Sequence, residues 1–544
     1  MAKKRKARKK NAPKPGEVGY LSPTQLRNAR KRRAKKISRS AEGSPGDRTT
    51  SGNKRHRPPD GADPSLKFLR NPEGAPIVQT ARRYLEAKLS PSSSDGNYTN
   101  ARFRVYLGPT KQWRTVAKLA VRPHPSGQGV AIGLFRPGTH DVVSVSNCTA
   151  HHDSINAAVS ALTKICGEKD VSMNLAFDDI TGEGFLRYVA LSVERATGAV
   201  QLCLVWNSVI YPKRHDGSGE DDEGCNDEGR RKLLNIVREL KRFHGNKEKR
   251  TRRRGKKGRG QEGKNEQSLN NSSNTASSGR EFSSFSLHSL WVHYNSTWKH
   301  GNAIFDTAAP AEAWEHLCGP RYIEETLDLT NHAPPMPNPV KLRFPPNVFR
   351  QANIDAFTTI VGTIRRMIHR YSKEERERAE GSTQDLPTCL ELYGGVGTIG
   401  LNMVDLTSSL TSSDENPHNY ACFQGSAAES LPNELRERLT YVPRNATDVV
   451  AGGHGPVGAE ILIVDPPRKG LDRPVLDFLC KEQDAAVGPK LLTYISCGFD
   501  AFQRDADALL DSGKWRIYHA EGHLLFPGSD AIETLAFFAR TSMS

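Results

Sequence analysis

Residues 387–401 have the sequence PTCLELYGGVGTIGL, in which an apolar run leads into a glycine-rich loop and a second apolar segment. The run predicts a buried strand, and the loop at residues 395–400 predicts a tight turn that opens a helix. Small residues at such a turn let the backbone approach a ligand closely. An acid, Asp414, follows seventeen residues after Gly397, where a carboxylate can bind ribose hydroxyls.

This loop leaves three interpretations open. The spacing G-x-G-x-x-G with a downstream acid is typical of nicotinamide-dinucleotide enzymes. Enzymes that use S-adenosylmethionine have a closely similar loop, and a strand–helix turn need not bind any ligand. The segment before Asp414, SSLTSS, is a poor strand by composition. The loop alone therefore does not decide the cofactor.

Strand-like and helix-like segments alternate over residues 341–544. The clearest strands are ILIV at 461–464, LLTYIS at 491–496 and two closing segments at 515–526 and 532–540. Continuous apolar strands separated by helices predict an α/β fold, with a parallel, doubly wound, Rossmann-like sheet covered on both faces. Ligands of such sheets bind beyond the carboxyl ends of the strands.

The preceding residues divide by composition. Residues 1–75 predict a disordered basic tail, since they are too polar to form a core. Residues 76–340 predict a smaller α+β domain for RNA binding, with short alternating strands between about 97 and 210. A charged insertion at about 213–282 interrupts it, and SFSLHSLWVHYN at 284–295 is expected to restore the sheet. The insertion carries a helix with one apolar face, formed by Leu233, Leu234, Val237 and Leu240.

Positive charge is concentrated in two segments. The chain has a formal net charge of +17, but residues 1–60 carry 20 Lys and Arg against four acids, and residues 241–264 carry 12 against two. The remainder is therefore acidic. Concentrated positive charge suits a polyanion, because each neutralised phosphate releases counterions. A solvated tail that serves solubility or import is the alternative interpretation.

The nine cysteines are scattered and form no close pairs in the sequence. This spacing predicts neither a disulfide framework nor a metal or iron–sulfur site, and it fits a reducing compartment. No apolar run reaches the roughly 20 residues that span a bilayer. The N-terminus, MAKKRKARKK, lacks the apolar segment of a secretory signal. We therefore expect no membrane partner.

Two reactive side chains follow predicted strands. In ILIVDPPRKG, residues 461–470, Asp465 precedes two prolines that stiffen the turn beside Arg468. A helix cap or an ion pair with Arg468 is the structural alternative for this acid. The run LLTYIS ends at Cys497, which is either a buried apolar filler or a nucleophilic sulfur.

Taken in chain order, five motifs resemble those of the RNA uracil-C5 methyltransferase family. They are F-x-Q-x-N at 349–353, LELYGGVGTIGL at 390–401, DPPRKG at 465–470, YISCGFDAFQRD at 494–505 and FPGSDAIET at 526–534. The segments FLRYVALSVERATGAVQLCLVWN and PRYIEETL resemble the family's preceding domain more weakly. The resemblance implies a class I methyltransferase fold that uses S-adenosylmethionine.

The resemblance also implies roles for eight residues. Cys497 matches the family's nucleophile, which adds to C6 of uracil, and Glu533 matches the base that removes the C5 proton. The implied substrate is a uridine of structured RNA, either tRNA or rRNA, which must leave its stack to react. The family's cofactor- and base-site positions fall on Gln351, Tyr393, Thr398, Asp414, Asn445 and Asp465.

The chain departs from the family pattern at three places. Gly498 and Phe499 stand where Asn-Pro usually follows the nucleophile, Leu524 replaces an Asp, and Ala531 replaces a His two residues before the base. Two alternatives to an active enzyme therefore stay open. One is a catalytically weakened RNA-binding folding or assembly factor of the same fold, and the other is a nicotinamide-dependent dehydrogenase.

We expect a monomer that binds no metal ion or iron–sulfur cluster. The basic segment KKRKARKK at residues 3–10 favours location in the nucleus or nucleolus. The cytoplasm or an organelle is the alternative, because a basic arm that binds RNA has the same composition.

Overall fold

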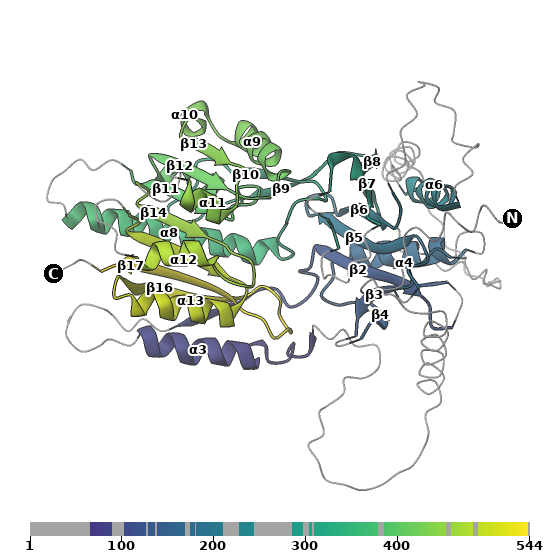
Figure 1. The fold of residues 1–544 in the computed structure, drawn as a ribbon, viewed down its shortest axis with the longest axis horizontal. Coiled ribbons are helices and arrows are strands. Elements are labelled where there is room, and N and C mark those ends of the chain that lie inside the picture. The colour runs from purple at the N-terminus through teal and green to yellow at the C-terminus, as the bar shows by residue number, and fades with distance from the viewer. Residues whose placement is uncertain are drawn as a thin grey trace, which may run out of the picture. The chain divides into compact units, whose positions relative to one another are not determined.

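A computed structural model describes residues 66–89, 103–126, 129–136, 139–168, 174–179, 181–209, 228–243, 285–296, 304–306, 309–378, 386–452, 458–481 and 488–541 (Figure 1). Two compact units divide these residues. The N-terminal unit includes Ala117–Cys148 and Asp153–Arg321, and the C-terminal unit includes His56–Val116, Thr149–His152 and Tyr322–Ser544. The predicted basic tail lies outside the described residues as far as residue 65.

The N-terminal unit is a seven-stranded sheet in the order β4-β3-β2-β5-β6-β7-β8. The strands β5 and β6 form the hairpin predicted around the ATGA turn, and β7 lies parallel to β6, so the sequence after the insertion does restore the sheet. The strands are β2 (Val116–Pro123), β3 (Val130–Phe135), β4 (Val142–Ser144), β5 (Leu186–Glu194), β6 (Ala199–Trp206), β7 (Leu287–Tyr294) and β8 (Trp314–Cys318).

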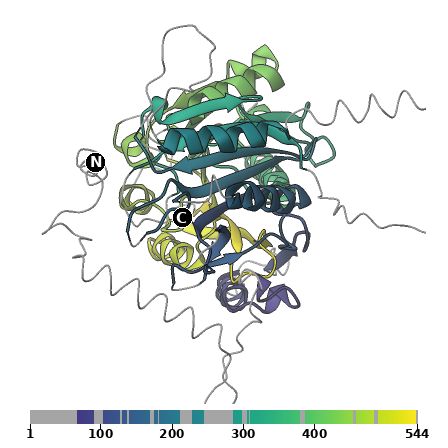
Figure 2. The ribbon, with the colours of Figure 1, turned by 90° about the vertical axis from the view of Figure 1, so that its right-hand side faces the viewer.

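Two helices cover one face of this sheet (Figures 1 and 2). The helix α4 (Asp153–Gly167) packs against β3, β5 and β6, and α6 (Glu228–Lys241) packs against β7 and α4. The helix predicted inside the insertion is therefore real, although the flanking residues 210–227 and 244–284 lie outside the described residues. Its predicted apolar face is slightly wrong, because Leu234 is half-buried and Ile236 is buried in its place.

The C-terminal unit contains an eight-stranded sheet in the order β1-β16-β17-β15-β14-β11-β12-β13. The five strands from β15 to β13 are parallel, whereas β17 runs antiparallel to both β15 and β16. The strands are β1 (Arg104–Leu107), β11 (Thr388–Leu392), β12 (Ser409–Ser413), β13 (Leu439–Val442), β14 (Ile461–Val464), β15 (Leu491–Ser496), β16 (Trp515–Leu524) and β17 (Glu533–Arg540). The predicted doubly wound α/β sheet is confirmed.

Helices bury both faces of this sheet (Figure 1). Along β14, Ile461 and Ile463 join the apolar cluster of α8 (Ile354–Arg378) and α9 (Asn419–Ser430), while Leu462 and Val464 join the cluster on the other face. Successive side chains of a strand point to opposite faces, so a strand buried on both sides must be apolar throughout. The second cluster involves α3 (Pro76–Leu89), α11 (Ala446–Ala451), α12 (Arg473–Cys480) and α13 (Phe499–Asp511).

The boundary of the C-terminal unit differs from the sequence-based boundary at residue 341. The segment before residue 117 belongs to this unit, because β1 adds a parallel strand to β16 and α3 packs on β16 and α13. The hairpin of β9 (Ile323–Leu327) and β10 (Val340–Phe344) also belongs here. It is held by α9, since Lys341 and Arg343 each pair with Glu429 at 2.9 Å. Residues 66–75, assigned to the tail, include Ala75, which is fully buried.

The α-helix predicted after the glycine loop is wrong. Two short 3₁₀ segments, Gly400–Asn402 and Val404–Leu406, take its place. The buried guanidinium of Arg365 donates to the carbonyl of Asn402 and pairs with Asp405, so these groups are satisfied without a continuing helix. The poor strand before Asp414 does form, as β12, since β11 and β13 pair with it on both sides.

The boundary is tested by Leu85→Ala on α3. Leu85 is fully buried in the cluster shared with α12 and α13, so its truncation should destabilise the C-terminal unit by about 2–5 kcal/mol. Urea denaturation with hydrogen exchange of peptides from β15 and β17 measures this effect. The exposed Arg83 on the same helix gives the control, Arg83→Ala. A cost below about 0.5 kcal/mol for Leu85→Ala, as at a surface site, would place α3 outside this unit.

Candidate functional site

Five of the predicted site residues lie at one edge of the C-terminal sheet. Tyr393, Asp414, Asp465 and Cys497 directly follow β11, β12, β14 and β15, which are parallel strands. Glu533 begins β17, and β17 is antiparallel to β15, so it starts at the same edge. Residues scattered over 140 positions of sequence are thereby brought to adjacent strand ends. This is the edge where doubly wound sheets bind their ligands.

The glycine loop leaves its backbone open at Gly395. A Cβ atom built on Gly395 meets nothing within 4 Å, and its φ of 57° is unfavourable for other residues. Its N–H donates to Oδ2 of Asp414 at 3.1 Å, and its carbonyl accepts from the Tyr441 hydroxyl at 3.1 Å. The loop is thus fixed by side chains of the neighbouring strands, with its open side free to receive a ligand.

Asp414 is held as a hydrogen-bond acceptor. Its carboxylate accepts from the N–H of Gly395, from the N–H of Asn416 at 2.8 Å and from the side chain of Asn419 at 2.9 Å. An ionised carboxylate offers about four acceptor positions, so Asp414 can also accept from a ribose hydroxyl. The open loop and this fixed acid are the features that S-adenosylmethionine requires, and the residues present fit that cofactor.

The segment carrying Gln351 runs across this edge. The carbonyl of Asn347 accepts from the Asn416 side chain at 2.9 Å, beside the loop after β12. The buried side chain of Asn353 donates to the carbonyl of Leu525 at 2.9 Å, just after β16. Both loops lie at the carboxyl edge, since β16 is parallel to β15 through their common partner β17. Gln351 lies between these two attachments and is half-buried.

Two predicted side chains bond away from the open loop. The Tyr393 hydroxyl donates to Asp472 at 3.0 Å, and burial raises the pKa of Tyr393. Asn445 caps α11, where its side chain accepts from the N–H of Asp448 at 2.9 Å. Thr398 is half-buried in the loop, and its carbonyl accepts from the side chain of Asn402.

One important acid, Glu391, was missed from the sequence. It is buried in β11, where it accepts from the N–H of Gly400 at 2.9 Å and from the Ser412 hydroxyl at 2.6 Å. Burial, with Asp465 and Asp414 nearby, raises the pKa of Glu391 to about 7. This carboxyl joins the glycine loop to β11 and β12. A lone acid inside the apolar run LELY is the signal that could have revealed it.

Asp465 and Glu533 both favour their protonated forms. Burial first, and the charge of Asp414 second, raise the pKa of Asp465 to about 7. Burial and the charge of Asp465 raise the pKa of Glu533 well above its usual range, against the opposing charge of Arg468. Crowded carboxyl groups cannot all ionise in a dry site. The edge therefore holds carboxyl groups that can take up or release protons near neutral pH.

Cys497 is a half-buried thiol beside these acids. Ser496 pairs with Thr534 across β15 and β17, so Cys497 and Glu533 are the next residues on adjoining strand ends. Burial, Glu533 and Asp465 raise the pKa of Cys497 to about 11, while Arg468 acts in the opposite direction. A sulfur buried solely as apolar filler would not adjoin two carboxyl groups and a guanidinium.

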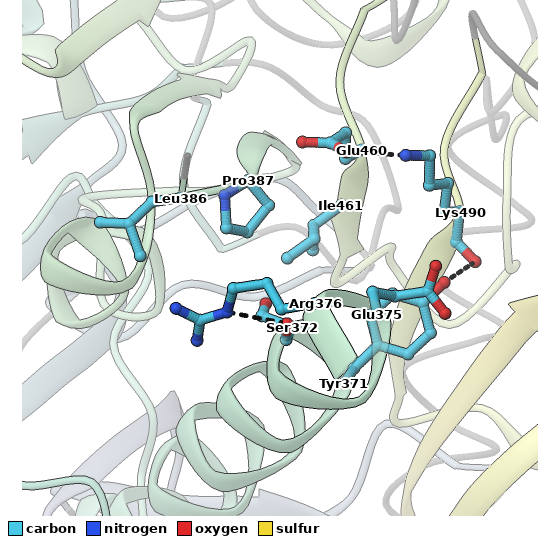
Figure 3. A pocket seen from close by; sticks show the side chains of 9 residues that line it. All are labelled: Tyr371, Ser372, Glu375, Arg376, Leu386, Pro387, Glu460, Ile461 and Lys490. Carbon is cyan, nitrogen blue, oxygen red and sulfur yellow. Dashed lines mark hydrogen bonds and ion pairs between the residues drawn. The ribbon is translucent and has the colours of Figure 1, made fainter. Parts of the chain in front are cut away.

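A hollow in the same unit lies at the opposite edge of the sheet (Figure 3). Its walls include Glu460 and Ile461 at the start of β14 and Lys490 at the start of β15. Lys490 pairs with Glu460 at 2.8 Å, and the end of α8 supplies Tyr371. The amino ends of the strands carry none of the predicted site residues, so this hollow is separate from the candidate site.

Among the described residues, no group of three or more His, Cys, Asp or Glu side chains is arranged to hold a metal ion. None of the described helices is long and apolar enough to cross a membrane.

Known proteins resemble this chain in sequence and fold. An uncharacterized RNA methyltransferase of Protochlamydia amoebophila is 28% identical over 437 residues, which cover 80% of this chain and 88% of that protein. An uncharacterized RNA methyltransferase of Bacillus cereus is 19% identical and covers 85% of this chain and 77% of its own length. No family model matches.

Among solved structures, the tRNA (uracil-54, C5)-methyltransferase of Pyrococcus abyssi in complex with S-adenosyl-L-homocysteine has a TM-score of 0.50 at 18% identity, covering 85% of this chain and 83% of that one. The resemblance to the RNA uracil-C5 methyltransferase family is confirmed. The C-terminal unit accordingly has the class I methyltransferase fold, and S-adenosylmethionine is the cofactor that this fold and its open glycine loop support.

The raised pKa of Asp465 is tested by Asp465→Asn. A carboxyl whose pKa is raised on folding adds stability below its unfolded pKa, near 4, and loses it as the pH rises through about 7. Asparagine cannot ionise, so the melting temperature of the variant relative to the wild type should increase from pH 5 to pH 8, by about 2–4 °C for each kcal/mol. Thermal melts at both pH values measure this shift.

The control is Asp477→Asn on α12, where the acid pairs with Arg473 at the surface. A relative melting temperature of Asp465→Asn that does not change between pH 5 and pH 8 would contradict the crowding of carboxyl groups at this edge.

Proposed function

We propose that this protein transfers a methyl group from S-adenosylmethionine to C5 of a uridine in RNA, with Cys497 as the nucleophile and Glu533 as the base. The observation that carries the proposal is the adjacency of these two residues at the carboxyl edge. A thiol and a carboxyl with raised pKa stand on adjoining strand ends, beside the acid and the open glycine loop suited to the cofactor. The RNA methyltransferases similar to this chain support the same class of substrate.

The thiol is needed because C5 of uracil is a weak nucleophile. S-adenosylmethionine supplies the methyl group when bound. Addition of the Cys497 thiolate to C6 moves an electron pair onto C5 and makes that carbon nucleophilic. The open backbone at Gly395 and the acceptor Asp414 hold the cofactor. Gln351 lies on the segment that crosses the edge, from which it can contact the base.

Glu533 resolves the adduct. After C5 has gained its methyl group, the C5 proton must leave before the sulfur can be eliminated from C6. Glu533 must be ionised at that moment, and its raised pKa makes the carboxylate a stronger base than a solvent-exposed glutamate. Proton removal regenerates the C5–C6 double bond and releases Cys497.

RNA is favoured as the carrier of the uracil by the charge of the chain. Residues 1–60 and 241–264 hold most of its excess Lys and Arg, and such segments bind phosphate without reading sequence. The target uridine must leave its stack to bring C5 and C6 to the strand ends. The N-terminal unit is the part of the chain that we expect to select the site.

The proposal is tested with S-adenosylmethionine labelled in its methyl group and separate preparations of tRNA and rRNA. The wild-type protein should form 5-methyluridine, and Cys497→Ala should form none. Glu533→Gln should lower turnover by about 10²–10⁴-fold and accumulate a methylated covalent protein–RNA complex, because addition still occurs while proton removal fails. Denaturing gels and nucleoside mass spectrometry detect the two products.

Cys480→Ala, which removes a half-buried thiol on α12, is the control and should retain wild-type activity. Methylated product from Cys497→Ala would contradict the covalent route. Tight RNA binding by the wild type without any methyl transfer would favour the folding or assembly factor, and binding of a nicotinamide cofactor alone would sink both RNA interpretations.

A further inference from the structure

Arg468 lies beside the proposed nucleophile because of backbone packing. It follows Asp465, Pro466 and Pro467 in the turn after β14, and the two prolines restrict the backbone there. The turn contacts Gly498, the residue after Cys497. The contact joins the ends of two neighbouring strands, β14 and β15, at the carboxyl edge.

The approach of these two segments requires the absence of a side chain at Gly498. A Cβ atom built on Gly498 would stand 2.4 Å from the carbonyl oxygen of Arg468 and 3.1 Å from its Cα. Both are backbone atoms of a proline-stiffened turn and cannot swing away. The φ of Gly498 is −129°, an ordinary value for any residue. Space and not backbone conformation therefore explains the glycine, and an asparagine would displace Arg468.

The charge environment gives this packing a chemical consequence. Burial and the acids Glu533 and Asp465 oppose ionisation of the Cys497 thiol, whereas a hydrogen bond from Arg468 and its positive charge favour it. Arg468 acts in the same way on Glu533. The side chain of Arg468 is exposed to solvent, so its guanidinium keeps much of its hydration while it faces the site.

We propose that the guanidinium of Arg468 pairs with the Cys497 thiolate and holds it for attack on the base, and that Gly498 permits this pairing by letting the Arg468 backbone pack against it. The thiol proton leaves to solvent water. The sulfur then forms its bond to C6, and the displaced electron pair moves to C5. Arg468 is thus a further catalytic residue, because it contacts a reacting atom. This role rests on the proposed function.

The role is tested by the pH dependence of alkylation of Cys497 in the full chain, without RNA or cofactor. Iodoacetamide reacts with thiolates, and mass spectrometry of the Cys497 peptide reports its rate separately from the other cysteines. Loss of an adjacent positive charge should raise the midpoint by about 1–3 pH units in Arg468→Gln. At pH 8, alkylation of Cys497 should be at least about tenfold slower than in the wild type.

Three further variants sharpen the test. Arg468→Lys keeps the charge and should shift the midpoint less than Arg468→Gln. Gly498→Ala keeps the guanidinium but displaces the turn, so it should raise the midpoint as well. Arg473→Gln removes an exposed arginine that pairs with Asp477 and should leave the midpoint unchanged.

Melting curves and the alkylation of the buried cysteines show whether each variant is folded. Arg468→Met, which keeps the apolar stem, replaces Arg468→Gln if that variant unfolds. A wild-type midpoint in a folded neutral variant would overturn the pairing, and a wild-type midpoint in Gly498→Ala would overturn the role of the glycine. Alkylation needs neither substrate, so failure of methyl transfer with a normal Arg468 effect would reject the proposed function alone.

Discussion

The crowding of carboxyl groups at one edge of the sheet is the constraint on which the site depends. Asp414, Asp465 and Glu533 stand at adjoining strand ends, and Glu391 lies just below them in β11. Burial and mutual repulsion keep some of these groups protonated near neutral pH. A thiol in such surroundings resists ionisation, so the arrangement needs a cation, and Arg468 provides it. The backbone contact at Gly498 follows from that need.

Much of this edge could be predicted from the sequence, because its residues follow recognisable strands. Asp465 and Cys497 each end a continuous apolar run, and parallel strands bring such ends together. Glu391 was missed because its partners, Gly400 and Ser412, come from separate segments. The boundary near residue 341 could not be predicted, since β1 finds its partner β16 more than 400 residues away in the chain. Periodicity describes local structure and carries no information on such pairing.

The departures from the family pattern have different physical reasons. Gly498 is required by the approach of the Arg468 backbone. Leu524 is buried in the apolar cluster beneath α3 and α13, where an unpaired aspartate would be costly. The buried pair of Glu521 and His523 lies on β16 nearby, and His523 is directly opposite Glu533 in the strand register. An imidazole therefore stays close to the base although Ala531 has replaced the usual histidine. These substitutions alter how the reactive groups are supported and retain both reactive groups.

The central claim is that Cys497 forms a covalent bond to the substrate base. RNA containing 5-fluorouridine tests it most directly, because fluorine at C5 cannot be removed as a proton and the adduct should persist. Incubation with S-adenosylmethionine, followed by nuclease and protease digestion, should yield the Cys497 peptide carrying a methylated fluorouridine nucleotide. An adduct on any other residue, or methylation of uridine RNA without an adduct on its fluorouridine counterpart, would contradict the account.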